Sequence, residues 1–282
     1  GNGKLSKRDG DRLGFPVFPL EWKDPVSGEI NSGYREKGFF PQAFVNMLAL
    51  LGWTPPGEQE IMGLDEMARA FQLEKVHKAG SKYNYEKACW FNQQYLHQNS
   101  VAELAALFLP ILEEKGLNPK GFGTDEEAKS GSENYLTRVV SLIKDRCTLI
   151  PDLWDQSRFF FQRPDEYEAE PVKKKWDASK ETFFDKVIDL FESDPGLWNT
   201  PATEQAGSAE PDHPESVPGE YLLEEKFKAL MQAEGMKPGE VMLPLRVMLT
   251  GGRFGPAVFT IAALLGQKET IQRIRLALPS FK

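Results

Sequence analysis

The chain has 282 residues, of which 40% are hydrophobic and 27% are charged, and its formal net charge is -8 with a pI near 5.2. This length and apolar content suffice for several compact units, each with its own core. The acidic balance argues against a strongly basic nucleic-acid coat, because non-specific affinity for phosphates rises with the number of cations offered. Any binding of RNA must therefore use local patches.

The sequence also limits the location and the metal chemistry of the protein. No stretch is long and apolar enough for a membrane span, and the first residues lack the pattern of a signal peptide. The two cysteines, Cys89 and Cys147, and the three histidines are widely separated, whereas a zinc site requires close spacings. We expect a cytoplasmic protein with no membrane association, no metal and no disulfide.

The first residues, GNGKLSKRDGD, place Lys4 and Lys7 on either side of Ser6 in a glycine-containing segment. Two ammonium groups on such a segment could move onto a polyphosphate as charge develops there. By composition alone, a solvated run of charge is the more frequent explanation. Glycine, proline and aromatic residues dominate the first forty residues, which predicts an extended segment with a short hairpin around DPVSGE.

From Phe40 onwards, apolar residues recur at helical spacing, and most of the chain is predicted to be helical. The best-marked helix begins after Ser100, which forms a capping box with Glu103, and stops at Gly116. A second capping box, Thr124 with Glu127, precedes a helix that runs towards Arg146. Further helices are predicted over residues 41–51, 63–71, 84–96, 153–161, 184–191, 223–234, 241–249, 257–265 and 270–278.

Residues 200–220 form a proline-rich, acidic stretch with almost no large apolar side chains. Such a stretch cannot bury enough surface to offset the entropy lost on ordering, so we expect a mobile insertion. The motifs GxSxG and GxxxxGK[ST] are absent. The sequence GGRFG at residues 251–255 is predicted to be a turn between helices first and an anion-binding nest second.

Several motifs in order resemble one family. The string KLSKR, residues 4–8, resembles the K-M-S-K-S signature of class I aminoacyl-tRNA synthetases in the form typical of glutamyl-tRNA synthetases. Later segments of the chain resemble further segments of the same family and follow each other in the family's order. They are YREKGFFPQAFVNMLALLGW, FQLEKVHKAGSKYNYEKACWFNQQYL, KDRCTL, SRFFF and PLRVMLTGGRFGPAVFTIAALLG. These segments span nearly the whole chain. The all-α anticodon region favours the bacterial type over glutaminyl and eukaryotic relatives with β-barrel domains.

The resemblance implies a mainly α fold. A stem-contact region with a short irregular or β N-terminal segment would occupy residues 1–99. Two all-α anticodon-binding domains would follow at residues 100–162 and 163–282. The family's Rossmann catalytic domain lies before the K-M-S-K-S loop, so the resemblance implies a C-terminal fragment that begins at this loop and is inactive alone. Its partners would be that missing domain and tRNA(Glu), and we expect a monomer.

The resemblance also implies the chemistry of the intact enzyme. Glutamate and ATP, with Mg, give glutamyl-adenylate, and the acyl group then passes to the 3′-terminal ribose of tRNA(Glu). No complete catalytic set and no bound ATP is expected in this chain. The ATP-binding loop would be formed by Lys4, Leu5, Ser6, Lys7 and Arg8.

The anticodon readers can be placed by the same resemblance. Arg146 in KDRCTL would read the first anticodon base, and Arg246 in PLRVMLTG would read the third. The apolar stripe of the Arg246 helix leaves this arginine projecting off it, free to meet RNA. The segment that holds Arg253, Gly255 and Val258 would meet the middle base. One pattern of the family has a threonine where this chain has Gly255, so backbone contacts or Arg253 would have to substitute for its side chain.

Two functions from different classes remain open at this point. One is the RNA-recognising part of a glutamate-tRNA ligase, and the other is a non-catalytic helical protein-interaction module derived from the same fold. The acidic net charge is compatible with the second. Whether the parent enzyme also charges tRNA(Gln) is left open by the sequence, although Arg146 favours discrimination against it.

Overall fold

The structure is a computed structural model that describes residues 14–57, 59–78, 81–118, 133–174, 176–199, 217 and 219–282. The contacts within the chain form two compact units. The first unit takes the described residues of Gly1–Lys115 and Ile143–Gln156, and the second takes those of Gly116–Leu142 and Ser157–Lys282. The predicted three-part division, with boundaries after residues 99 and 162, stays a prediction.

Three sequence predictions fall outside the described residues. These are the lysine-containing segment of residues 4–8, the capping box at Thr124 and Glu127, and most of the 200–220 insertion. The elements of the first unit are β1 (Trp22–Lys23), β2 (Ile30–Asn31), α2 (Pro41–Gly52), α3 (Leu64–Ala70), η1 (Leu73–Lys75), α4 (Tyr85–Gln98), α5 (Val101–Glu114) and η3 (Lys144–Arg146).

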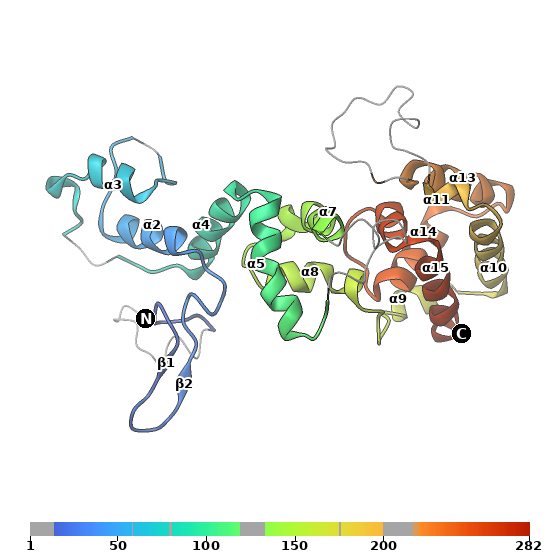
Figure 1. The fold of residues 1–282 in the computed structure, drawn as a ribbon, viewed down its shortest axis with the longest axis horizontal. Coiled ribbons are helices and arrows are strands. Elements are labelled where there is room, and N and C mark those ends of the chain that lie inside the picture. Colours follow the sequence, from blue (N-terminus) through green and yellow to red (C-terminus); the bar gives the residue numbers. More distant parts are fainter. Residues whose placement is uncertain are drawn as a thin grey trace. The chain divides into compact units, whose positions relative to one another are not determined.

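The predicted hairpin is confirmed as an antiparallel pair, with Trp22 opposite Asn31 and Lys23 opposite Ile30 (Figure 1). The side chain of Asp24 forms the turn, because its Oδ1 atom accepts hydrogen bonds from the backbone amides of the two residues after Pro25. The capping box of α5 is also confirmed, with Ser100 and Glu103 satisfying each other's backbone amides.

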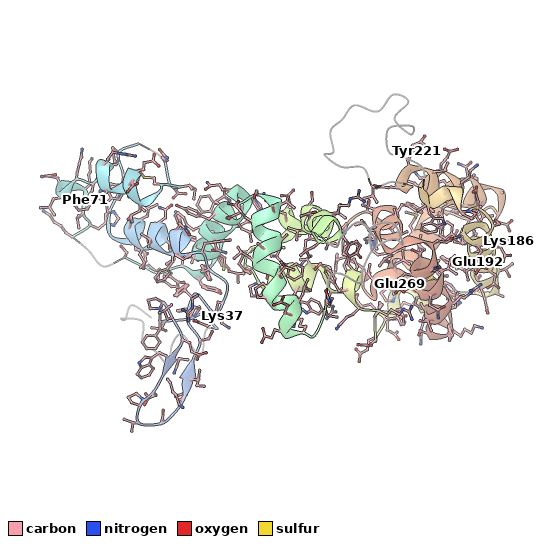
Figure 2. All side chains as sticks on the ribbon, in the orientation of Figure 1. Lys37, Phe71, Lys186, Glu192, Tyr221 and Glu269 are labelled. Atoms are coloured by element: carbon pink, nitrogen blue, oxygen red, sulfur yellow. The ribbon has the colours of Figure 1, made fainter. Side chains whose placement is uncertain are left out.

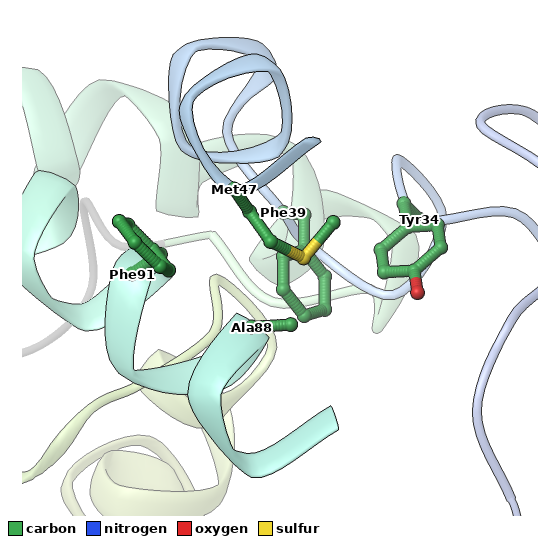
Figure 3. Close-up of a cluster of buried hydrophobic side chains, with 5 residues drawn as sticks. All are labelled: Tyr34, Phe39, Met47, Ala88 and Phe91. Carbon is green, nitrogen blue, oxygen red and sulfur yellow. The ribbon is translucent and has the colours of Figure 1, made fainter. Parts of the chain in front are cut away.

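The core of the first unit lies where α2 packs against α4. Figure 3 shows Met47 from α2, Ala88 and Phe91 from α4, and the rings of Tyr34 and Phe39 from the segment between β2 and α2. All five side chains are buried, and this apolar burial is the main favourable term that holds the unit together. Asn92 of α4 is also buried, and its side chain donates to and accepts from backbone groups.

The elements of the second unit are α7 (Glu133–Ile143), α8 (Asp152–Phe161), α9 (Glu170–Lys173), α10 (Ala178–Ser193), α11 (Gly196–Asn199), α13 (Glu220–Ala233), α14 (Pro238–Thr250), α15 (Val258–Ala277) and η4 (Leu278–Phe281), of which α7 and α8 contribute residues to both units. Helix α15 is central, since it packs against α10, α13, α14 and η4 (Figure 1). The sequence predicted two helices over this stretch. The structure agrees, because Gly266 inside α15 has a φ of 76° and a ψ of 170°, which break the helix between the two predicted segments.

Within the described residues, the fold is mainly α with one two-stranded sheet, as predicted. Helices α9 and α11 were not predicted, because four residues are too few to show a helical period. No helix in this part of the chain is both long and apolar enough to cross a membrane.

Candidate nucleic-acid interface

Arg146 is the last residue of η3 and is exposed. Within the described ranges of the chain, no hydrogen bond or ion pair engages its guanidinium. The neighbouring Lys144 is tied down instead, because its Nζ atom donates to the Asn99 carbonyl oxygen at 2.6 Å. Arg146 is therefore presented to the surroundings from a short turn with its five N–H donors available.

The backbone that follows Arg146 is held in place by buried polar groups. The amides of Thr148 and Leu149 both donate to Oδ2 of Asp152 at 2.8 Å. Asn92, which is fully buried, donates from Nδ2 to the Thr148 carbonyl oxygen at 2.6 Å and accepts from the Phe40 amide at 2.8 Å. These bonds fix the position of the Arg146 turn within the first unit, since buried polar groups that lose partners are costly.

Cys147, next to Arg146, is fully buried and its thiol donates to the Ile143 carbonyl oxygen at 3.3 Å. Burial raises the pKa of the Cys147 thiol to about 12, with nearby Asp152 and Asp155 adding to the effect. The thiol therefore stays protonated at neutral pH and serves packing rather than nucleophilic chemistry.

Arg246 lies on α14 in the second unit and is partly buried. Its Nη1 atom donates to the Pro256 carbonyl oxygen at 2.6 Å. The prediction that Arg246 projects freely from the helix is wrong in this respect, because the side chain closes the turn that connects α14 to α15. The apolar pattern correctly predicted which side of α14 is buried. It could not show that the chain after α14 turns back and brings the Pro256 carbonyl oxygen to the guanidinium.

The turn between α14 and α15 is fixed at its start by Gly251. This residue has a φ of 79°, and a Cβ atom there would lie 2.8 Å from the Glu166 carbonyl oxygen, so only glycine fits. The Glu168 amide donates to the Gly251 carbonyl oxygen at 2.8 Å. Thr250 Oγ1 lies 2.9 Å from the Gly252 carbonyl oxygen and accepts from the Gly252 amide at 3.2 Å.

The middle of this turn combines a cation with an exposed ring. Arg253 Nε donates to Glu168 Oε2 at 2.6 Å, and both side chains are half exposed. The Arg253 guanidinium carbon lies 5.5 Å from the centroid of the Phe254 ring. Phe254 is 78% exposed. Gly255 has a φ of 148°, and a Cβ atom there would lie 3.4 Å from Arg246 Nη1.

The structure thus brings some predicted site residues together. Arg246 and Gly255 are neighbours, and Arg253 lies in the same turn. Val258, however, is only 3% exposed, so its side chain belongs to the packing of α15 rather than to an exposed surface. Arg146 belongs to the other unit, and the predicted ATP loop of residues 4–8 lies outside the described residues.

Sequence reasoning missed Glu168 and Phe254. A phenylalanine between Arg253 and Gly255 in a glycine-rich turn is a usable signal, because no regular element is available there to bury it. Glu168 had no such signal, since its pairing with Arg253 joins residues 85 positions apart. Among the described residues, no three His, Cys, Asp or Glu side chains are grouped so that they could hold a metal ion.

Comparisons with known proteins add the following. A family model described as an anticodon binding domain matches residues 103–209 and 220–278. A second model, described as the catalytic domain of class I tRNA synthetases (E and Q), matches residues 21–90. The first model covers more than half of the chain.

Individual relatives agree with these matches. The chain is 43% identical to a glutamate–tRNA ligase of Porphyromonas gingivalis over 99% of its own length and 48% of the relative. It is also 43% identical to a glutamate–tRNA ligase of Parabacteroides distasonis, over 100% of the chain and 49% of the relative. The chain therefore spans about half the length of these curated relatives.

Solved structures are similar as well. The crystal structure of a glutamate tRNA ligase from Elizabethkingia meningosepticum, in complex with its amino acid, superposes with a TM-score of 0.81 at 35% identity, over 100% of this chain and 49% of that one. The glutamate-tRNA synthetase of Elizabethkingia anophelis gives a TM-score of 0.76 at 36% identity, over 99% and 48%. The resemblance stated from sequence motifs is confirmed: the chain belongs to the anticodon-binding domain family and is homologous over its length to bacterial glutamate–tRNA ligases.

Proposed function

We propose that this chain is the tRNA(Glu)-binding, anticodon-recognising part of a glutamate–tRNA ligase. The observation that supports this most is the match of the anticodon-binding family model to residues 103–209 and 220–278, which contain Arg146, Arg246 and Arg253. Each of these arginines lies in or beside a turn whose backbone is fixed by hydrogen bonds. Fixed turns reduce the entropy lost on binding, which favours selective recognition.

In this proposal Arg146 reads the first anticodon base and Arg246 the third. A guanidinium presents a planar fork of donors, and an unstacked base of an RNA loop offers acceptors along its edge. Gly255 brings the backbone close to the middle base, with Arg253 beside it. Val258 supports the turn from the core.

The whole enzyme would join glutamate to tRNA(Glu) through glutamyl-adenylate, using ATP and Mg. The match of residues 21–90 to the catalytic-domain model supports a link between this chain and that chemistry. The ATP contacts of Lys4, Leu5, Ser6, Lys7 and Arg8 stay a prediction, and so does the inactivity of this chain alone. The same holds for a cytoplasmic location, for a monomeric state and for the separate Rossmann domain as a partner.

The second candidate function is a non-catalytic helical module that binds another protein. The net charge of -8 favours it, because an acidic surface repels RNA at long range. The local distribution of cations favours the first candidate, since each unit carries arginines at its predicted RNA contacts, Arg146 in the first and Arg246 and Arg253 in the second. Binding measurements separate the two.

The experiment compares the dissociation constants of the chain for tRNA(Glu) and for an unrelated tRNA at two salt concentrations. We expect preference for tRNA(Glu). Substitution of Arg146 or Arg246 by alanine should each weaken the binding of tRNA(Glu) by about 1–3 kcal/mol, as for an arginine that reads a base.

A matched control sharpens this test. Arg275→Ala removes an exposed arginine of the second unit that pairs with Glu192. This variant should leave binding unchanged. Because Arg246 also closes a turn, its variant requires an unfolding curve, and only a loss of affinity in protein that remains folded counts. Equal and weak binding of both tRNAs, insensitive to Arg146→Ala, would favour the protein-binding module.

A further inference from the structure

Phe254 is the most exposed of the large aromatic side chains in the described part of the chain. Its exposed fraction is 78%, compared with 58% for Tyr221 and 52% for Phe71, both of which Figure 2 labels. A single exposed apolar side chain needs no explanation by itself. Two further observations set this one apart: the backbone that carries it is fixed, and a cation lies against its ring.

Hydrogen bonds hold the backbone before and after Phe254 at three positions, Gly251, Gly252 and Pro256. Gly251 at the start is bound by the Glu168 amide and has no room for a side chain. Gly252 is bonded to the Thr250 hydroxyl through both its amide and its carbonyl oxygen. At the far end, the carbonyl oxygen of Pro256 accepts from Arg246. The ring is thus displayed from a fixed turn and not from a loosely attached loop.

Arg253 adds positive charge directly beside the ring. Its guanidinium carbon lies 5.5 Å from the ring centroid, and its Nε atom is oriented by Glu168. Among the described residues, neither of its Nη nitrogens donates a hydrogen bond. A flat aromatic face next to a guanidinium is the combination that single-stranded nucleic acid uses, with a base stacked on the ring and a phosphate near the cation.

The surroundings of the ring favour RNA over a protein partner. The exposed or partly exposed neighbours in the turn are Gly251, Gly252, Arg253, Gly255 and Ala257, and none carries a large apolar side chain. In the described part of the second unit, the other exposed large apolar side chains are Tyr221 and Leu276, on α13 and α15. Protein docking requires a continuous apolar patch of some hundreds of Å², whereas one ring face suffices for one base.

We propose that Phe254 is a stacking platform for an unpaired base of the bound tRNA, with Arg253 contacting the adjoining phosphate. This rests on the proposed function and deepens it, because it names a contact that is independent of hydrogen-bond readout. Every base has a π face, so the platform contributes affinity with little dependence on base identity. In this turn, where Gly255 offers no side chain, stacking on the ring holds the base while the fixed backbone approaches its edge.

The test measures the affinity of the full 282-residue chain for a tRNA(Glu) transcript. We expect Phe254→Ala to weaken binding about 10-fold or more, within the range seen when an aromatic platform for one base is removed. Phe254→Trp and Phe254→Tyr should retain binding, whereas Phe254→Leu, which keeps apolar surface but lacks a π face, should not. Tyr221→Ala, the removal of another exposed aromatic of the same unit, should have no effect.

A spectroscopic readout locates the stacked base. Transcripts that carry 2-aminopurine at one anticodon-loop position each are titrated with the chain, because stacking on an aromatic ring quenches its fluorescence. One position should be quenched by the wild-type chain and by Phe254→Trp but not by Phe254→Leu. Specific wild-type binding that Phe254→Ala leaves intact, without a quenched position, overturns the platform alone. Failure of the wild-type chain to prefer tRNA(Glu) overturns the proposed function, and the platform with it.

Discussion

Glu269 on α15, labelled in Figure 2, forms ion pairs with two arginines. Its carboxylate accepts hydrogen bonds from Arg163 at 2.7 Å and 2.9 Å and from Arg273 at 2.7 Å. Arg273 is only 2% exposed and also donates to the carbonyl oxygens of Phe159 and Leu249. Burial raises the pKa of Glu269, but the hydrogen bonds and charges of the two arginines outweigh burial, so the net pKa lies below the ordinary 4.5.

A carboxyl group whose pKa is lowered in the folded state stabilises the fold above its unfolded pKa. That contribution is lost as the pH falls through the folded pKa. We therefore predict that Glu269→Gln lowers the free energy of unfolding at neutral pH by about 1–3 kcal/mol, because it leaves a buried cation without its counter-charge. Below about pH 4.5 the difference between wild type and variant should shrink. Urea unfolding followed by circular dichroism at several pH values measures both.

The control for Glu269 is Glu234, which pairs with Lys186 at the surface of the same unit. Exposed pairs contribute little, so Glu234→Gln should cost less than about 1 kcal/mol. A loss of stability in Glu269→Gln that stays constant down to about pH 3 would show that the carboxylate is not the charge that stabilises Arg273.

At the scale of elements, the sequence predicted the parts whose signals are local. The hairpin at Asp24, the capped helix after Ser100 and the apolar stripe of α14 follow from neighbouring residues, and all three are confirmed. What the sequence could not show is contact between distant residues. The apolar stripe of its helix predicted a free Arg246, because the sequence does not show that the next turn brings the Pro256 carbonyl oxygen to its guanidinium. Arg273 lies in the helix predicted over residues 270–278, but that pattern does not show that its donors reach carbonyl oxygens at the end of α8 and on α14.

Gly38 offers a test of whether the segment between β2 and α2 positions the chain at Ile150 and Pro151. It follows β2, has a φ of 87°, and a Cβ atom there would lie 2.3 Å from Pro151 Cδ and 2.9 Å from the Ile150 amide. The Ile150 amide donates to the Gly38 carbonyl oxygen at 3.3 Å, so this contact supports the chain after Arg146. We predict that Gly38→Ala costs about 2–4 kcal/mol, from positive φ together with overpacking.

The matched variant is Gly28→Ala in the hairpin turn. Gly28 has a φ of 74°, but nothing lies within 4 Å of an added Cβ atom, so only the conformational cost of about 1 kcal/mol applies. Unfolding curves of the two variants isolate the packing contribution as their difference. Equal losses would mean that the segment around Pro151 moves aside and that Gly38 does not position it. Under the proposed function, Gly38→Ala should also weaken binding of tRNA(Glu) more than Gly28→Ala does.

At the scale of the whole molecule, charge sets how RNA can be bound. The chain has 42 acidic and 34 basic side chains, excluding histidine, so its overall field repels a polyanion. Affinity must come from a few local cations and from contacts to bases, and few phosphates are neutralised in that case. The salt dependence of binding should consequently be shallow compared with that of strongly basic RNA-binding proteins.

This gives a prediction that separates the roles of the arginines. The logarithm of the dissociation constant for tRNA(Glu) is plotted against the logarithm of the salt concentration for the wild-type chain and for its variants. If Arg146 reads a base, Arg146→Ala shifts the whole line to weaker binding and leaves the slope unchanged. If Arg253 contacts a phosphate beside Phe254, Arg253→Ala reduces the slope by about 1. The reverse assignment of the two slopes would make Arg146 a phosphate contact and Arg253 a base contact.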